Sequence, residues 1–130
     1  MTKTLLIIIG ISCALVSAAG IMWYNYPLRE VRGWLDDKDW HKRLDAVRLL
    51  REINDRESTP KIRQIFLNHE YPIVSFNALW TLVEWNDRES IPEIKKLLND
   101  KNENVRKEAE DALKTLGVPA EEIEEAKENK

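Results

Sequence analysis

The sequence predicts an all-α protein, an α-solenoid of about three antiparallel helix pairs preceded by one transmembrane helix. Three observations support this fold class. The tetrapeptide Asp-Arg-Glu-Ser occurs at 55–58 and returns unchanged at 87–90, and a period of this size is typical of stacked helical pairs. Apolar residues recur at helical spacing in three registers along the chain. An uncharged run fills residues 5–22.

The N-terminal run has the length and composition of a membrane anchor. Leu5 to Met22 contains no charged residue, and eighteen helical residues span roughly 27 Å, close to the thickness of the hydrocarbon core. Trp23, Tyr24 and Tyr26 follow directly, where aromatic side chains gather at the membrane interface. We expect residues 1–26 to form a single-pass anchor, with these three aromatic residues at the interface.

Two other fates of this segment remain open. A signal peptidase would find small residues around Val16-Ser17-Ala18 or Ser17-Ala18-Ala19, which would make the chain a processed envelope or secreted protein. Lipid attachment at Cys13, the single cysteine, would make it a lipoprotein. Each alternative removes the anchor but leaves the predicted helix pairs unchanged.

The residues around the anchor give weaker indications of orientation and self-association. Lys3 precedes the run, whereas Arg29 and Arg32 follow it, which favours a cytoplasmic location for the helical domain. Small residues at positions 10, 14 and 18 (Gly10, Ala14 and Ala18) recur every four residues. This spacing allows two membrane helices to approach closely, so a weak homodimer is a further expectation.

The three predicted helix pairs align on their apolar positions. The first helices show an i, i+3, i+4 stripe, made by Val31, Trp34 and Leu35, then Ile62, Ile65 and Phe66, then Ile94, Leu97 and Leu98. The second helices align on Ala46, Ala78 and Ala109, on Leu50, Leu82 and Leu113, and on Ile53, Trp85 and Leu116. Trp34 and Trp85 are therefore expected in the core.

Turn and capping residues place the boundaries between the pairs. The predicted domain is 27–117, with pairs at 27–54, 55–86 and 87–117, followed by an acidic cap or tail at 118–130. Asp55 and Asp87 are expected to cap first helices, and Ser90 with Glu93 offers an alternative capping box. The remaining signals are Pro72 at the first position of a helix, Gly117 at the end of one, and a short acidic helix over 121–127.

These pairs resemble HEAT repeats, in the short variety called PBS-lyase HEAT-like. The motif is Asp87-Arg88-Glu89-Ser90-Ile91-Pro92-Glu93-Ile94 followed by Asn104-Val105-Arg106-Lys107-Glu108-Ala109. The resemblance covers residues 27–117, and it implies a right-handed stack with the second helices lining one face. Two positions depart from the pattern: Ser75 stands where arginine is expected, and Lys42 where valine is expected.

Catalytic chemistry finds little support in the sequence. The net charge of −3 argues against a nucleic-acid partner held by bulk electrostatics. HEAT-like deoxyhypusine hydroxylases bind iron through several His-Glu pairs, but this chain has one, His69-Glu70, since Lys42 follows His41. We expect no catalytic residue, cofactor or metal, and a scaffold that binds protein. An enzyme or enzyme accessory of the phycobilin-lyase type is the alternative that the resemblance allows.

The second helix of the middle pair carries an additional apolar stripe. Phe76, Trp80 and Val83 follow at i, i+4, i+7, away from the inward stripe. Arg48 and Asp111 occupy the positions equivalent to Trp80 in the neighbouring pairs. The candidate protein-binding residues are therefore Phe76, Trp80, Val83 and Arg48. Burial of Phe76 and Val83 in a central helix that is covered on both sides is the alternative interpretation.

Overall fold

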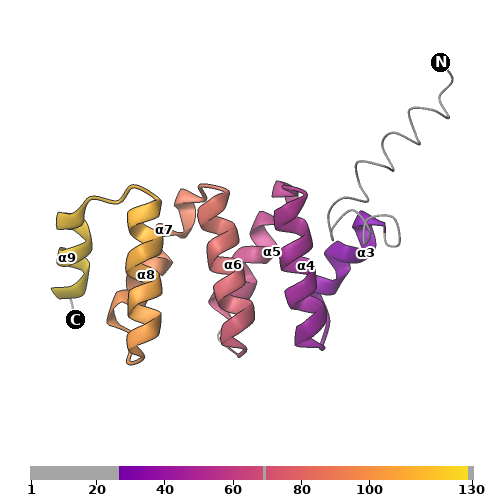
Figure 1. The fold of residues 1–130 in the computed structure, drawn as a ribbon, viewed down its shortest axis with the longest axis horizontal. Helices are drawn as coiled ribbons and strands as arrows, with labels where there is room; N and C mark the ends of the chain where they lie inside the picture. The colour runs from indigo at the N-terminus through magenta and orange to yellow at the C-terminus, as the bar shows by residue number, and fades with distance from the viewer. Residues whose placement is uncertain (1–26, 69, 129–130) are drawn as a thin grey trace, which may run out of the picture. The chain divides into compact units, whose positions relative to one another are not determined.

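The computed structural model describes residues 27–68 and 70–128, and these residues form helices and turns with no β-strand (Figure 1). The all-helical prediction is confirmed for this part of the chain. Contacts divide the chain into two compact units, residues 1–58 and residues 59–130. The first unit contains one helix pair in its described part, and the second contains two pairs and a terminal helix.

The first unit pairs α3 (Leu28–Gly33) with α4 (Trp40–Glu52). A 3₁₀ turn at Trp34–Asp36 continues α3, and a second one at Arg56–Ser58 ends the unit. The predicted stripes form the core of this unit, where the buried side chains include Val31, Leu35, Ala46, Val47 and Leu50. Trp34 is an exception, because it is only partly buried. The expectation that it belongs fully to the core is wrong.

The second unit contains α5 (Thr59–Leu67), α6 (Pro72–Glu84), α7 (Ile91–Lys96), α8 (Glu103–Thr115) and α9 (Ala120–Glu128). Helix α5 packs on α6 and α7 packs on α8, while α6 also contacts α8 and α9 contacts both α7 and α8 (Figure 1). Its fully buried large side chains include Ile62, Leu79, Leu82, Ile94, Leu113 and Ile123. The predicted acidic helix is therefore present as α9, and it covers the end of the stack.

The second helices all end in the same way. Asn54, Asn86 and Gly117 have φ angles of 57°, 53° and 77°. After each of them, the next backbone N–H bonds back to a carbonyl five residues earlier, as Asp87 does to Leu82 at 2.8 Å. This is the Schellman ending, in which a left-handed residue satisfies the last carbonyls of a helix. Glycine enters this region freely, and asparagine enters it more readily than most other residues.

The second repeated aspartate, Asp87, does not cap a helix as predicted. No helix N–H bonds to the Asp87 side chain, and the Ser90–Glu93 capping box does not form. The Asp87 carboxylate instead accepts from Arg63 Nε at 2.7 Å and also from the Ser90 hydroxyl.

The first unit repeats this arrangement, which we call the Arg–Asp clamp. Arg32 Nε donates to Asp55 Oδ2 at 2.8 Å, and the Ser58 hydroxyl donates to Asp55 at 2.6 Å. A second carboxylate meets each guanidinium, Glu57 for Arg32 at 2.8 Å and Glu89 for Arg63 at 2.7 Å. Each clamp ties the first helix of a pair to the loop that follows its second helix.

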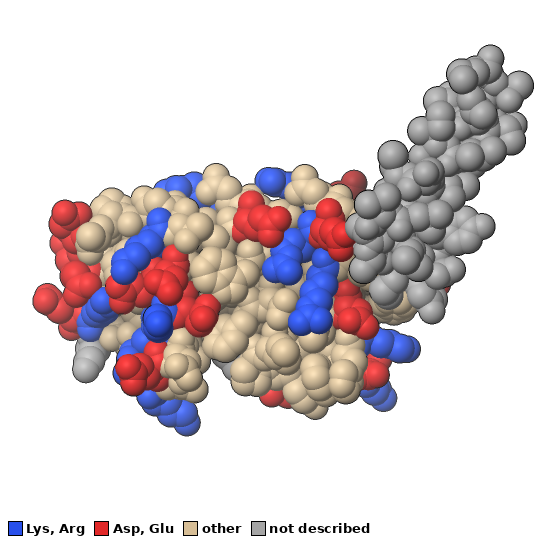
Figure 2. Space-filling view, viewed as in Figure 1, with Lys and Arg blue, Asp and Glu red and all other residues tan. Residues whose placement is uncertain are grey.

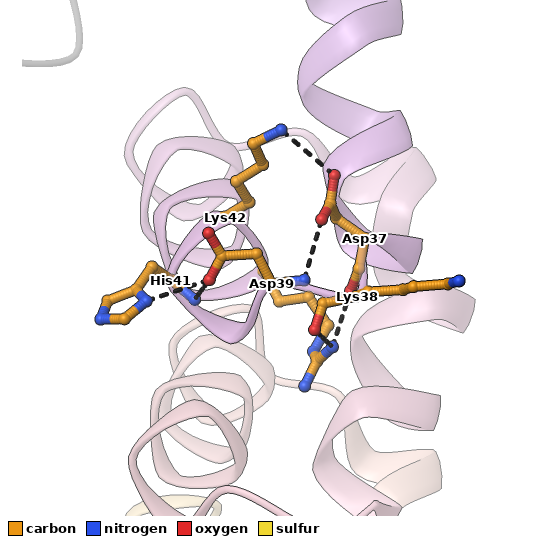
Figure 3. Close-up of polar contacts among 6 residues, drawn as sticks. Asp37, Lys38, Asp39, His41 and Lys42 are labelled. Carbon is orange, nitrogen blue, oxygen red and sulfur yellow. Dashed lines mark hydrogen bonds and ion pairs between the residues drawn. The ribbon is translucent and has the colours of Figure 1, made fainter.

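The loop inside a pair is held by an arginine in two of the three pairs. Arg43 Nη1 donates to the carbonyls of Asp37 and Lys38 at 2.6 and 3.2 Å, and the Asp39 carboxylate caps α4 through the His41 N–H at 2.9 Å (Figure 3). Arg106 bonds the carbonyls of Asp100 and Lys101 in the same way. In the middle pair Ser75 takes this role, and its hydroxyl donates to the Asn68 carbonyl at 2.7 Å.

The predicted anchor lies outside the described residues. Residues 5–22, the aromatic residues at 23, 24 and 26, and the small residues at 10, 14 and 18 all fall there. Among the helices of the described ranges, none combines the length and the apolar character that crossing a bilayer requires.

Candidate protein-interaction surface

Helix α6 presents a surface almost without charge in the second unit. Glu84 is its single charged residue among thirteen, whereas α8 has charged side chains along most of its length. Figure 2 shows this difference as an uncharged area over α6, beside blue and red side chains over α8 and α9. Ile73, near the start of α6, is 47% exposed. Contiguous apolar surface, and not one exposed side chain, is what marks an interaction site, so the neighbours of Ile73 on α6 decide what this surface can do.

Trp80 lies on this surface in a fixed orientation. Its indole Nε1 donates a hydrogen bond to Glu108 Oε2 on α8 at 2.8 Å, and its ring is partly buried. Phe76, one turn earlier on α6, is also partly buried. The hydrogen bond satisfies the polar atom of the indole while part of the ring remains accessible, the combination that suits tryptophan to interfaces.

The other two predicted binding residues lie elsewhere. Val83 is 6% exposed and belongs to the buried side chains, so it contributes nothing to an accessible stripe. Arg48 is exposed on α4, in the first unit. Ile73 was missed by the sequence reasoning, although its spacing of three residues before Phe76 and seven before Trp80 already places it on the same side of a helix. We call Ile73, Phe76 and Trp80 the α6 surface.

A small cavity opens beside Phe76, within the second unit. Its volume is about 180 Å³, and Phe66, Ser75, Leu79 and Val105 are among the residues that line it. Phe66 and Leu79 are buried, while Phe76 and Val105 are partly accessible. The cavity is therefore apolar at its base. Asp100, Lys101 and Asn102, from the loop before α8, also line it and supply polar groups.

The surface formed by α8 and α9 carries many charges, in contrast to the α6 surface. Glu110 accepts from Lys114 Nζ at 2.6 Å and pairs with Lys127 of α9 at 2.9 Å. The Lys114 hydrogen bond and then the Lys127 hydrogen bond lower the pKa of Glu110 to about 2. The positive and negative charges within these ion pairs offset each other, so α8 and α9 offer a partner a hydrated surface of mixed charge instead of an apolar one.

No group of His, Cys, Asp and Glu side chains suited to holding a metal ion occurs in the ranges that the structure describes. His69 lies outside those ranges. His41 is exposed at the start of α4, where its Nδ1 lies 3.0 Å from the Asp39 carboxylate (Figure 3). This contact is part of the helix cap.

Comparison with known proteins agrees with the repeated architecture. A family model described as HEAT repeats matches residues 59–126, which is just over half of the 130-residue chain. The chain belongs to the HEAT repeat family. The match begins with α5 and extends into α9, where it ends two residues before that helix does. No curated protein and no solved structure matched the chain.

Proposed function

We propose that this HEAT repeat protein is a membrane-anchored scaffold that binds a protein partner and catalyses no reaction itself. HEAT repeats generally mediate protein–protein interaction, because stacked helix pairs present an extended surface. The observation that carries the proposal is the α6 surface. Ile73 is exposed there on a helix whose one charge is Glu84, while the equivalent helix of the next pair has charged side chains along most of its length.

The arrangement of Ile73, Phe76 and Trp80 also has the features of a binding hot spot. Hot spots combine aromatic anchors with surrounding groups that exclude water. Phe76 and Trp80 supply two aromatic rings, and the bond from Trp80 to Glu108 holds one of them in place before any partner binds. Preorganisation of this kind reduces the entropy lost on association.

Capture experiments test the binding surface. The full chain, tagged at its C-terminus and extracted in mild detergent, should retain a protein that Ile73→Glu and Trp80→Ala each lose. Asp111→Ala is the matched control, because it removes an exposed α8 side chain at the position equivalent to Trp80. Retention of every captured protein by both α6 variants would overturn the proposal.

The anchor is proposed from residues 5–22, and its test is separate. The chain should stay with membranes after alkaline carbonate washing, and the mass of the purified protein should include residues 1–26. A mature mass lacking these residues would support the processed envelope or secreted form instead. Release of the intact chain by carbonate would contradict membrane spanning.

The proposal that the chain is not an enzyme rests on the lack of a convergent set of reactive side chains in its sequence. Purified protein should therefore carry no stoichiometric metal and no bound chromophore. Elemental analysis and the visible absorption spectrum check this. A metal or chromophore at one equivalent per chain would favour the enzyme or accessory alternative.

A further inference from the structure

We propose that the cavity beside Phe76 takes one bulky apolar side chain of a partner segment, and that an acidic residue next to that side chain pairs with Lys101. This inference rests on the proposed function, and it specifies the chemistry of the segment that the α6 surface recognises.

The cavity has the size of a single side chain. Its volume of about 180 Å³ is far below the 300–1,000 Å³ of ordinary small-molecule sites. An apolar cavity of about 150 Å³ is sufficient to hold one benzene molecule. A phenylalanine or leucine side chain therefore fits, whereas a cofactor or a long acyl chain does not.

Ser75 accounts for the open space in this pair. The other two pairs have an arginine at the equivalent position, and both arginines reach the carbonyls of their loop. Ser75 makes the corresponding bond to the Asn68 carbonyl with a much shorter side chain, and it lines the cavity. A serine leaves open the space that an arginine side chain would begin to fill.

One of the two charged groups that line the cavity, the Lys101 ammonium, favours an acidic neighbour on the partner. The Asp100 carboxylate accepts the Asn102 N–H at 2.8 Å, and because this bond leaves its negative charge in place, the acidic residue of the partner must lie on the Lys101 side of the cavity. Lys101 is exposed, and its ammonium group has no ion-pair partner within residues 27–68 and 70–128. An incoming carboxylate on that side would pair with this ammonium without displacing an existing partner, whereas a basic residue placed beside Lys101 would be repelled by it.

Binding of short peptides to the full chain in detergent tests the proposal. The probe is a ten-residue peptide with one phenylalanine flanked by two glutamates on each side, and the comparison peptides replace either the phenylalanine by alanine or the glutamates by lysines. The Leu79 and Val105 methyl signals in NMR spectra should shift with the first peptide alone. Equal shifts with the lysine peptide, or none with any peptide, would overturn the proposal.

Two variants separate the apolar contact from the charged one. Val105→Phe fills the cavity from its accessible side and should weaken binding of the acidic peptide at least tenfold while keeping the circular dichroism of the wild type. Lys101→Glu should weaken it about threefold to fivefold, as expected for an exposed ion pair. Lys96→Glu, an exposed α7 change of equal charge away from the cavity, should leave binding unchanged. Unaltered binding to both Val105→Phe and Lys101→Glu would contradict the proposal.

The outcomes distinguish this proposal from the proposed function. A protein that depends on Ile73 and Trp80 but binds Val105→Phe as well as wild type would refute the cavity proposal and leave the scaffold function standing. Failure of the capture experiment with the α6 variants would refute the proposed function itself, whatever the peptides do.

Discussion

Arg63 on α5 donates from Nε to Asp87 Oδ2 at 2.7 Å, although the two residues lie 24 positions apart in the sequence. Arg32 and Asp55 make the same contact in the first unit. The repeated tetrapeptide is therefore a structural device, because its aspartate accepts a hydrogen bond from an arginine on the first helix of the preceding pair, and its serine hydroxyl also donates to that aspartate. The third pair has no such aspartate, because Val118 follows its left-handed residue, Gly117. Lys95, which takes the place of the arginine, forms an ion pair with Glu122 of α9.

Loss of the clamp in the second unit should destabilise the protein. Asp87→Asn keeps the shape of the side chain but removes the charge that binds Arg63, and hydrogen bonds to charged groups contribute about 2 kcal/mol. We expect the free energy of unfolding at pH 7 to fall by about that amount in urea titrations. Glu89→Gln is the control, because this side chain is largely exposed, and its effect should stay within about 0.5 kcal/mol. Similar effects of both changes would contradict the role of Asp87.

The clamp also predicts how stability depends on pH. The Arg32 hydrogen bond lowers the pKa of Asp55 below its ordinary value of 3.8. Burial acts to raise the pKa of Asp87, but the bonds from Arg63 and Ser90 outweigh it, and the pKa is lowered. A carboxyl whose pKa is lower in the folded state stabilises the protein above its unfolded pKa, and that stability is lost as the pH falls through the folded value.

Wild-type protein should therefore lose stability below about pH 4. Glu110, with a pKa of about 2, contributes in the same range, so the informative quantity is the difference between wild type and Asp87→Asn. This difference should be constant from pH 7 to 5 and should shrink below pH 4. Urea unfolding at each pH measures it, and a difference that grows on acidification would have the wrong sign.

The left-handed residues at the helix ends predict a contrast between two substitutions at one position. Asn86 has a φ of 53°, and a left-handed conformation costs an alanine roughly 1–2 kcal/mol. Asn86→Ala should lower the melting temperature clearly, while Asn86→Gly should stay close to wild type. Gly117→Ala should resemble Asn86→Ala, because a methyl group there meets no atom within 4 Å and the cost is conformational alone. Equal melting temperatures for the alanine and glycine variants at 86 would contradict this explanation.

Truncation of Trp80, within α6, and of Trp85, the C-cap residue of α6, should lower the stability of the protein by different amounts. Trp85 is 4% exposed, so Trp85→Ala should cost about 3–5 kcal/mol. Trp80 is partly buried and hydrogen-bonded to Glu108, so Trp80→Ala should lower the free energy of unfolding by about 1–2 kcal/mol. This loss is larger than expected for an exposed side chain such as those of Arg48 and Asp111, which occupy the equivalent positions. Chemical unfolding of both variants gives the comparison. A larger loss at Trp80 than at Trp85 would place Trp80 in the core.

Periodicity predicted the architecture well, since Ile62, Ala78, Leu82, Ile94 and Ala109 are all buried as their stripes require. The helix ends were harder to predict. Asp87 followed by Ser90 looks like a cap, but the preceding Asn86 turns the backbone so that the carboxylate meets Arg63 instead. That long-range contact has no local signal in the sequence. The left-handed asparagine before each tetrapeptide was not predicted either, although asparagine enters this region more readily than most residues.

The position of the candidate interaction surface was only partly predictable from the sequence. Trp80 and Phe76 were identified from their spacing and from the charged residues at equivalent positions. Spacing also places Val83 on this stripe, but Val83 is buried, as the alternative interpretation expects. It lies at the border of the apolar stripe, where a small rotation of the helix decides whether a side chain faces the core or the solvent. The bond from Trp80 to Glu108 depends on how α6 packs against α8, which spacing within one helix does not determine.

Site-specific photo-crosslinking tests the central claim, that α6 carries the partner-binding surface of this HEAT repeat scaffold, most directly. A photoreactive phenylalanine replaces Ile73 in the full chain, and in a second version it replaces Asp111, which is exposed on α8 at the position equivalent to Trp80. In native membranes we predict a discrete crosslinked protein from position 73, abolished by Trp80→Ala, and none from position 111. Crosslinking from position 111 alone, or products at 73 that Trp80→Ala leaves unchanged, would contradict the account.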